Sequence, residues 1–235
     1  MTTAYDIHCK RGIYFIGVVA LVMLASIPLA WGVADFQAAG ARNQLAQWEK
    51  NYAVGDDEAW NRALERLMYA NELHPENSSY EADLGRIYEW RAQKFPVWHK
   101  EAKIARTRSI HHFRKATDLR PAWGYIWAHY TQGKILNQEF DADALASFEK
   151  SMVLAPWESD AQQKILYVGM NIWDLLPIDM QSMLRTTLSR ALANNPTATI
   201  KLTAAMGKQK IVEPLLSMEQ RVLLARYSQR FGKRS

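Results

Sequence analysis

The chain has 235 residues and a formal net charge of +5, with 49% hydrophobic and 23% charged residues. This hydrophobic share is large enough for the chain to bury the core of one domain of ordinary size. The single cysteine, Cys9, excludes an intramolecular disulfide and a metal site built from cysteines.

The first feature in chain order is an uncharged apolar run from Ile13 to Ala34. A helix needs about 20 apolar residues to cross the hydrocarbon core of a bilayer, so the run predicts a transmembrane helix over residues 12–34. The run contains one proline, Pro28, which a membrane-spanning helix can tolerate.

The charges beside this run predict its orientation. Lys10 and Arg11 precede it and Asp35 follows it. By the positive-inside rule, residues 1–11 are a cytoplasmic segment and the bulk of the chain is periplasmic, as in a single-pass protein of the bacterial inner membrane.

A cleavable signal peptide is the alternative interpretation of the same run. Small residues at Gly32, Val33 and Ala34 resemble a cleavage site. The run is longer than the usual hydrophobic region of such peptides, which has about 7 to 15 residues, and this favours a span that is retained.

The rest of the chain has the pattern of an all-α protein. From 36 to 231 the apolar residues recur at helical spacing, and no Gly/Ser-rich linker or strand-like alternation interrupts them. We therefore predict a juxtamembrane helix over residues 35–52 and a helical domain over residues 53–231.

Four prolines indicate internal repeats within this domain. In tetratricopeptide (TPR) repeats a proline follows the second helix, and small and large apolar residues precede it at fixed positions where paired helices approach closely. Counting back five, eight and twelve residues from Pro75, Pro121, Pro156 and Pro196 gives three good matches and one poor one. These anchor positions are Ala70, Leu67 and Ala63; Ala116, Phe113 and Ser109; Ser151, Phe148 and Ala144; and Ala191, Leu188 and Leu184. The sequence thus predicts a TPR-like α-solenoid, in which Leu84, Gly85 and Tyr88 mark one first helix.

The spacing of the prolines indicates an insertion. The first interval is 46 residues, against a repeat period of about 34, and the excess falls near 91–108, where Pro96 interrupts the helical pattern. Residues 91–120 hold nine Lys or Arg and two acids. This local excess favours an anionic partner, such as a glycan or lipid headgroup, although a solvated repeat face explains it equally well.

Candidate contact residues lie in and around this basic region. Four cations, Lys100, Lys103, Arg106 and Arg108, are candidates for binding a protein partner or an anionic glycan. Trp98 and Trp157 lie outside regular helices and are candidates for exposed contacts. By contrast, Trp123, Trp127 and Tyr130 share one helical face, which is typical of a core.

We find no sequence signature of an enzyme. A nucleophile elbow, a zinc-protease motif, a phosphate loop and a dinucleotide fingerprint are all missing from the sequence. Adjacent His111 and His112 point in different directions on a helix, and Glu139, Asp141 and Asp143 are explained by capping of a helix start. We therefore predict no catalytic residue, no metal site and no cofactor.

Four longer segments resemble the VpsP-type polysaccharide biosynthesis proteins. They are LGRIYEWRA (84–92), RPAWGYIWAHY (120–130), FDADALASFEKSMVLAPWE (140–158) and VGMNIWDLL (168–176). This resemblance implies a non-catalytic, membrane-anchored scaffold or accessory protein for exopolysaccharide biosynthesis, assembly or export. It implies as partners the protein components of that machine, and no nucleic acid.

Two other function classes remain open. An anchored repeat protein can serve as an adaptor for cytochrome maturation or protein secretion by holding a client segment in its groove. A glycan-modifying enzyme is the third class, although repeat folds rarely supply a deep enclosed cleft.

Overall fold

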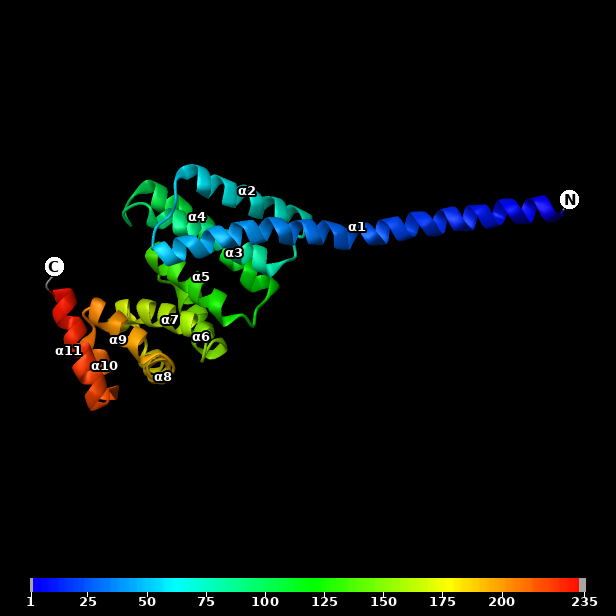
Figure 1. Cartoon of the computed structure of the whole chain (residues 1–235). Helices are drawn as coiled ribbons and strands as arrows, with labels where there is room; N and C mark the ends of the chain where they lie inside the picture. Colours follow the sequence, from blue (N-terminus) through cyan, green and yellow to red (C-terminus); the bar gives the residue numbers. More distant parts are fainter. Residues whose placement is uncertain (1, 233–235) are drawn as a thin grey trace.

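All regular elements in the described part of this chain are helices, which confirms the all-α prediction (Figure 1). The computed structural model describes the backbone of residues 2–232 and the side chains of 17–21 and 23–232. The α-helices are α1 (Thr2–Asn51), α2 (Asp57–Leu73), α3 (Ser78–Gln93), α4 (Lys100–Leu119), α5 (Gly124–Leu136), α6 (Ala142–Leu154), α7 (Ser159–Asn171), α8 (Ile178–Asn194), α9 (Pro196–Ala205), α10 (Gln209–Val212) and α11 (Met218–Gly232). Two short 3-10 helices are η1 (Trp173–Leu175) and η2 (Glu213–Leu215).

Helices that follow one another in the chain pack together. The most extensive contacts join α3 to α4, α1 to α2 and α5 to α6, and α7 packs on α8. Odd-numbered helices also touch: α1 contacts α3, and α7 contacts both α5 and α9. At the carboxyl end α11 returns to pack on α9. The body therefore extends from α1–α4 at one side to α8–α11 at the other (Figure 1).

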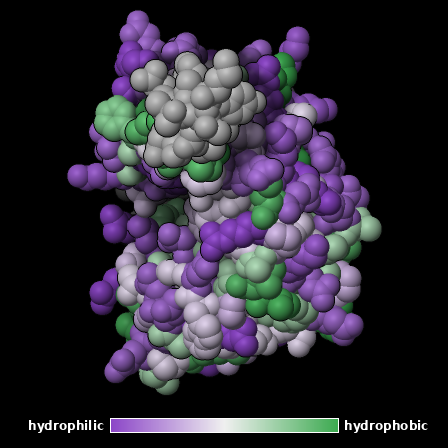
Figure 2. Space-filling view, turned by 90° about the vertical axis from the view of Figure 1, so that its right-hand side faces the viewer, coloured by the Kyte–Doolittle hydropathy of each residue, from purple (hydrophilic) through white to green (hydrophobic). Residues whose placement is uncertain are grey.

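One helix in the described chain is long and apolar enough to cross a membrane. Its apolar stretch lies in α1, has a mean hydropathy of 2.1 and is only 6% buried, so packing within the protein does not explain its composition. The amino-terminal half of α1 projects alone from the body (Figure 1), and mainly hydrophilic residues surround the side from which it emerges (Figure 2). Lys10 and Arg11, which are predicted to flank the span, and Cys9 have side chains outside the described set.

The carboxyl-terminal half of α1 belongs to the folded body. The segment predicted as a juxtamembrane helix continues the apolar helix without a break. It buries one face against α2 and α3, at positions four and three residues apart: Ala34, Ala38, Ala41, Leu45 and Trp48. The small alanines on this face allow close approach of the neighbouring helices. No linker separates the apolar stretch from the body.

Polar bonds fix this half of α1 against α3. The hydroxyl of Tyr80 donates to Asp35 at 2.6 Å, and Arg42 Nε lies 2.6 Å from Asp83 Oδ2. On the α2 side the ring of Trp31 stacks on His74, with centroids 4.5 Å apart. The body is thus attached to α1 on two sides.

All the predicted repeat anchors are buried. The four sets ending at Ala70, Ala116, Ser151 and Ala191 lie in the interior, including the poor match before Pro196. The reason for the glycine in α3 is also visible, because a Cβ built on Gly85 would lie 2.5 Å from the ring of Phe113 in α4. Close approach at small residues therefore governs how α3 and α4 pair.

The extra residues in the interval between Pro75 and Pro121 form a turn and a longer helix rather than a long loop. Only residues 94–99 connect α3 to α4, and Pro96 lies in this turn. The following α4 has 20 residues, whereas α6 has 13. His99 caps α4 by accepting a hydrogen bond from the Glu101 amide. Most of the basic region is therefore displayed on a regular helix.

Packing at these small anchors can be tested on a single helix. Ala144 of α6 is buried and Ala146 is exposed. We expect Ala144→Leu to lower the free energy of unfolding of the full-length protein in detergent micelles by about 1–3 kcal/mol, because the contact has no room for a larger side chain. Ala146→Leu, the matched control, should change it by less than about 0.5 kcal/mol. Identical urea midpoints for the two variants would show that residue 144 does not face the core.

Candidate functional site

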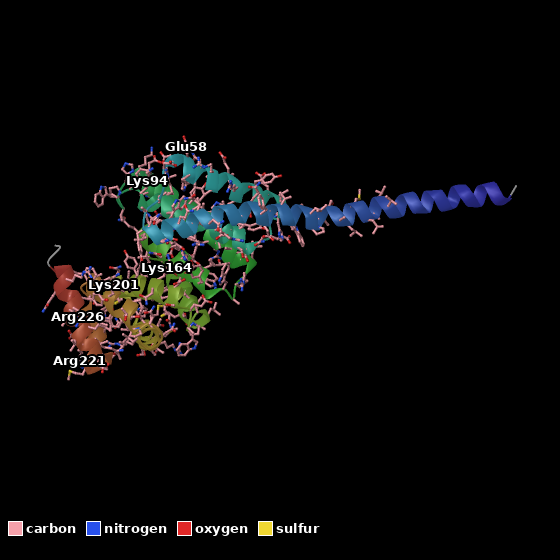
Figure 3. The ribbon with its side chains drawn as sticks, in the orientation of Figure 1. Glu58, Lys94, Lys164, Lys201, Arg221 and Arg226 are labelled. Atoms are coloured by element: carbon pink, nitrogen blue, oxygen red, sulfur yellow. The ribbon has the colours of Figure 1, made fainter. Side chains whose placement is uncertain are left out.

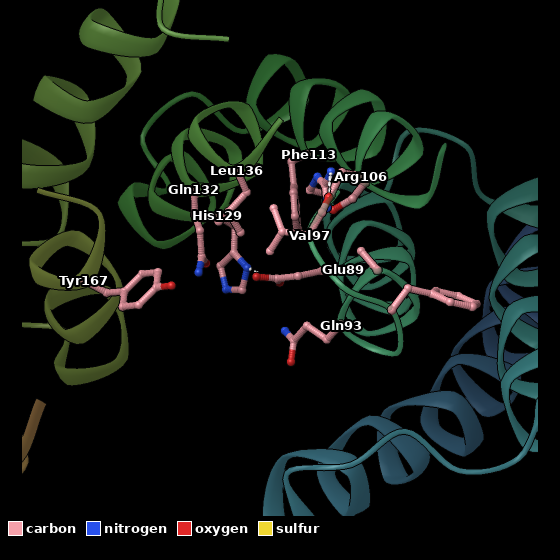
Figure 4. Close-up of a pocket in the computed structure, with 13 residues that line it drawn as sticks. Glu89, Gln93, Val97, Arg106, Phe113, His129, Gln132, Leu136 and Tyr167 are labelled. Atoms are coloured by element: carbon pink, nitrogen blue, oxygen red, sulfur yellow. Dashed lines mark hydrogen bonds and ion pairs between the residues drawn. The ribbon is translucent and has the colours of Figure 1, made fainter. Parts of the chain in front are cut away.

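A cavity between α3, α4, α5 and α7 has a mixed apolar and polar wall (Figure 4). Its volume is about 470 Å³, within the range of roughly 300–1,000 Å³ typical of small-molecule sites. Apolar and polar side chains share its wall: Ala92, Phe95, Val97, Phe113 and Leu136, with Glu89, Gln93, Arg106, Ser109, His129, Gln132 and Tyr167. Apolar walls with a few converging polar groups are characteristic of binding sites.

A carboxylate joins three helices at one side of this cavity. Glu89 of α3 lies 2.7 Å from Nδ1 of His129 on α5, and its other oxygen accepts a hydrogen bond from Lys164 of α7 at 2.8 Å. Lys164 also donates to Gln132 of α5 at 2.6 Å. Figure 4 shows Glu89 and His129 pointing toward one another, with the hydroxyl of Tyr167 directed at them from α7.

The charges in this network follow from burial and pairing. Burial by itself would raise the pKa of Glu89, but Lys164 and His129 outweigh it and hold that pKa well below its usual range. Burial, followed by the charge of Lys164, lowers the pKa of His129 to about 4 against the opposing effect of Glu89. At neutral pH the network therefore contains a carboxylate, an ammonium and a neutral imidazole.

The partner of Nδ1 determines the tautomer of His129. A carboxylate can only accept hydrogen bonds, so Nδ1 of the neutral ring carries the hydrogen and Nε2 holds a lone pair. Nε2 is buried and has no hydrogen-bond partner. The rings of Phe113 and Tyr125, with centroids 5.0 and 4.5 Å away, hold the imidazole in place. The arrangement produces a fixed hydrogen-bond acceptor in the cavity wall.

The cavity wall also contains a buried cation. Arg106 is 8% exposed, and its Nη2 donates to the carbonyl of Val97 at 2.8 Å. Its Nε has no hydrogen-bond partner, and no acid among the described residues forms an ion pair with it. Burial lowers the pKa of this guanidinium, which nonetheless stays protonated at neutral pH.

A second, smaller cavity of about 270 Å³ adjoins the first. Val97, Arg106 and Leu136 line both cavities, and Trp98 and Lys103 lie in the wall of the second. The turn between α3 and α4 therefore forms part of the wall of the combined space.

The structure brings together three of the six candidate contact residues. Trp98, Lys103 and Arg106 surround the second cavity, and Trp98 is 88% exposed. Arg106 differs from the expectation for a surface patch, because its side chain is buried.

The other three candidates line neither cavity. Lys100 and Arg108 are exposed on α4, where the Arg108 guanidinium lies over the ring of Tyr88. Trp157, 63% exposed, lies just before α7, and Arg190 of α8 is placed over its ring.

Much of the predicted basic excess is neutralised by ion pairs. Arg91 and Lys94 bind Asp57, Arg114 pairs with Asp118 and Asp143, and Lys115 pairs with Glu81. Within the described chain, the four candidate cations at 100, 103, 106 and 108 have no ion pair. Arg120, just after α4, also has no ion pair and lies over the ring of Trp123. Most of the positive charge without an ion pair is therefore on the first half of α4.

Sequence reasoning missed Glu89, His129 and Lys164, although a signal exists for the last two. His129 lies eight residues after Pro121, and Lys164 lies eight residues after Pro156. Gln132 follows His129 by three residues, and Tyr167 follows Lys164 by three, so each lies about one turn later on the same face of its helix. Equivalent positions after successive prolines therefore group His129 with Lys164, and Gln132 with Tyr167.

The site does not contain an evident nucleophile next to the histidine. A histidine bonded to a carboxylate is the acid–base half of a catalytic triad. Ser109 lines the same cavity, but its hydroxyl donates to the carbonyl of Gly85 at 2.8 Å.

The predicted capping role of the acids before α6 is seen at Asp141, whose carboxylate accepts a hydrogen bond from the amide of Ala144.

Comparisons with known proteins add no assignment. No protein-family model and no curated protein matches the chain. Among the residues with described side chains, no group of three His, Cys, Asp or Glu is arranged to hold a metal ion.

Neutral His129 makes stability depend on pH. Its pKa is about 4 in the folded chain and 6.5 ordinarily, so between these values the unfolded state binds a proton that the folded state does not. The free energy of unfolding should therefore fall as pH decreases from 6.5 to 4. The groups that face this ring are Glu89, Lys164, Arg86 and Tyr125.

The variant His129→Asn isolates this contribution, because its amide can still donate to Glu89. Between pH 7 and pH 5, urea unfolding of the full-length protein should lose roughly 1–2 kcal/mol more in the parent than in the variant. Parallel pH profiles for the two proteins would mean that His129 is not kept neutral by the fold.

Proposed function

We propose that the protein is a non-catalytic, membrane-anchored scaffold with a TPR-like helical body, acting in exopolysaccharide biosynthesis, assembly or export. The repeat architecture is supported by the burial of every predicted anchor and by the contacts among odd-numbered helices. Tandem helix pairs stack into a continuous surface that holds a partner. Here the odd-numbered helices α3, α5 and α7 would form that surface.

The observation that carries the proposal is the row of polar side chains on these three helices. Glu89, His129 and Lys164 come from α3, α5 and α7, which would be successive first helices of the repeats. Glu89 and His129 line one cavity, and Lys164 binds Glu89. Buried polar groups are costly unless they are paired, so a chain that only needed to fold would favour apolar residues here. A binding surface explains their presence.

The polysaccharide context rests on the resemblance of four segments to the VpsP-type proteins. Two of these segments contribute directly to the site. The segment over 84–92 contains Glu89, and the segment over 120–130 contains His129. Glu89, Ala92 and His129 of the cavity wall therefore lie in segments that carry the resemblance, and the rest of the wall comes from other parts of the chain.

The proposed topology places the body in the periplasm. The apolar stretch of α1 would span the inner membrane, with the basic residues Lys10 and Arg11 on the cytoplasmic side. Because α1 continues into the core without a linker, the helical body would be held close to the membrane surface.

Deletion and surface labelling test the proposal together. Clean deletion of the gene in its own bacterium should lower exopolysaccharide output, and the full-length chain should restore it. In spheroplasts, a membrane-impermeant thiol reagent should label Glu149→Cys, an exposed position on α6 away from the cavity. The parent protein, whose one thiol is Cys9, should be labelled only after permeabilisation.

Two results would contradict the proposal separately. Normal polymer output from the deletion strain would remove the polysaccharide role. Labelling of Cys9 in intact spheroplasts, with Glu149→Cys protected, would reverse the topology.

A further inference from the structure

The two adjoining cavities contain a cation whose charge the described protein does not neutralise. Arg106 is buried, its Nε has no partner, and its bond to the Val97 carbonyl contributes no negative charge. Removing a cation from water without an anion is strongly unfavourable. Glu89, the acid in the cavity wall, is already paired with Lys164. The site therefore lacks one negative charge, which a ligand can supply.

Two hydrogen-bond acceptors in the same walls also have no partner. One is Nε2 of His129, whose side chain belongs to a residue only 4% exposed. The other is Oδ1 of Asn137, which lines the second cavity. Acceptors of this kind are complementary to hydroxyl groups, which donate hydrogen bonds.

Apolar and aromatic surface completes the site. Phe95, Phe113 and Leu136 line the main cavity, and the indole of Trp98 is exposed at the second. The matching ligand combines a carboxylate, several hydroxyls and an apolar face on a small framework. A sugar acid has all three features.

We propose that the combined cavity binds one carboxylated sugar residue, a hexuronate. Its carboxylate would bind Arg106, a hydroxyl would donate to Nε2 of His129, and Trp98 and Lys103 would contact the adjoining part of the glycan. This inference deepens the proposed function and rests on it for the biological source of the sugar. The hexuronate can arrive as a free monosaccharide or as a residue within an anionic polymer.

The same geometry argues against two simpler ligands. A neutral hexose would leave the charge of Arg106 unpaired. An acidic peptide side chain would pair with Arg106 but would offer no hydroxyl to His129 or Asn137.

Calorimetric titration of the full-length protein in detergent micelles tests this assignment. The probes are glucuronate, an oligouronide, glucose and a glutamate-rich peptide. We expect glucuronate or the oligouronide to bind at least about tenfold more tightly than glucose, and Arg106→Gln to weaken this binding at least about tenfold. The matched control is Arg226→Gln, which makes the same charge change at an exposed site on α11 (Figure 3).

Thermal unfolding separates a binding role of Arg106 from a structural one. Glutamine can still donate to the Val97 carbonyl, and the substitution removes an unpaired buried charge. Without ligand, Arg106→Gln should therefore unfold at the same temperature as the parent or higher. A lower unfolding temperature, with binding lost only in proportion to unfolded protein, would make Arg106 a structural residue and overturn the proposal.

The remaining outcomes are distinct. Binding of glucuronate supports recognition of a free sugar acid, and binding of the oligouronide alone supports recognition within a polymer. Equal binding of glucose, binding of the peptide alone, or absence of binding would each overturn the inference. Normal polymer output from a deletion strain, with glucuronate still bound by the purified protein, would instead remove only the proposed function.

Discussion

The carboxylate of Glu89 is the group on which the arrangement of the site depends. It binds side chains from two other helices, and through them it joins α3, α5 and α7. A buried charge is stable only when it is paired, and removing one partner from such a pair typically costs about 3–5 kcal/mol. The position of Lys164 and the tautomer of His129 both follow from this carboxylate. With Glu89 ionised, the imidazole must present its lone pair away from α3.

The saturated network on one side of the cavity contrasts with the unpartnered groups elsewhere in its wall. Glu89 and Lys164 satisfy one another, whereas Nε of Arg106 and Nε2 of His129 have no hydrogen-bond partner. Unsatisfied buried groups reduce stability, and proteins retain such groups where binding needs them.

The packing of α1 against the body is a second constraint on the structure. Because its alanine-rich face packs directly on α2 and α3, the body and its cavity are joined rigidly to the apolar stretch of α1.

Sequence patterns predicted the helices and their core positions well, because both depend on local periodicity. The anchors around Leu67, Phe113 and Phe148 are buried, as their spacing from the prolines indicates. The site was harder to predict, because the bond between Glu89 and Lys164 joins residues 75 positions apart. The burial of Arg106 was also not evident, since a run of cations on a helix usually faces solvent. The fold brings the turn at 94–99 over this side chain, and no local pattern records that contact.

The protonation state of His129 tests this account most directly, because it depends on the Glu89 network and on burial together. Nitrogen-15 NMR of the full-length protein labelled at histidine, with His129→Asn used to assign the signal, reports which ring nitrogen carries hydrogen. The account predicts a neutral ring with hydrogen on Nδ1 at pH 7, unchanged at pH 5. A ring that gains a proton near its ordinary pKa, or that carries hydrogen on Nε2, would contradict it.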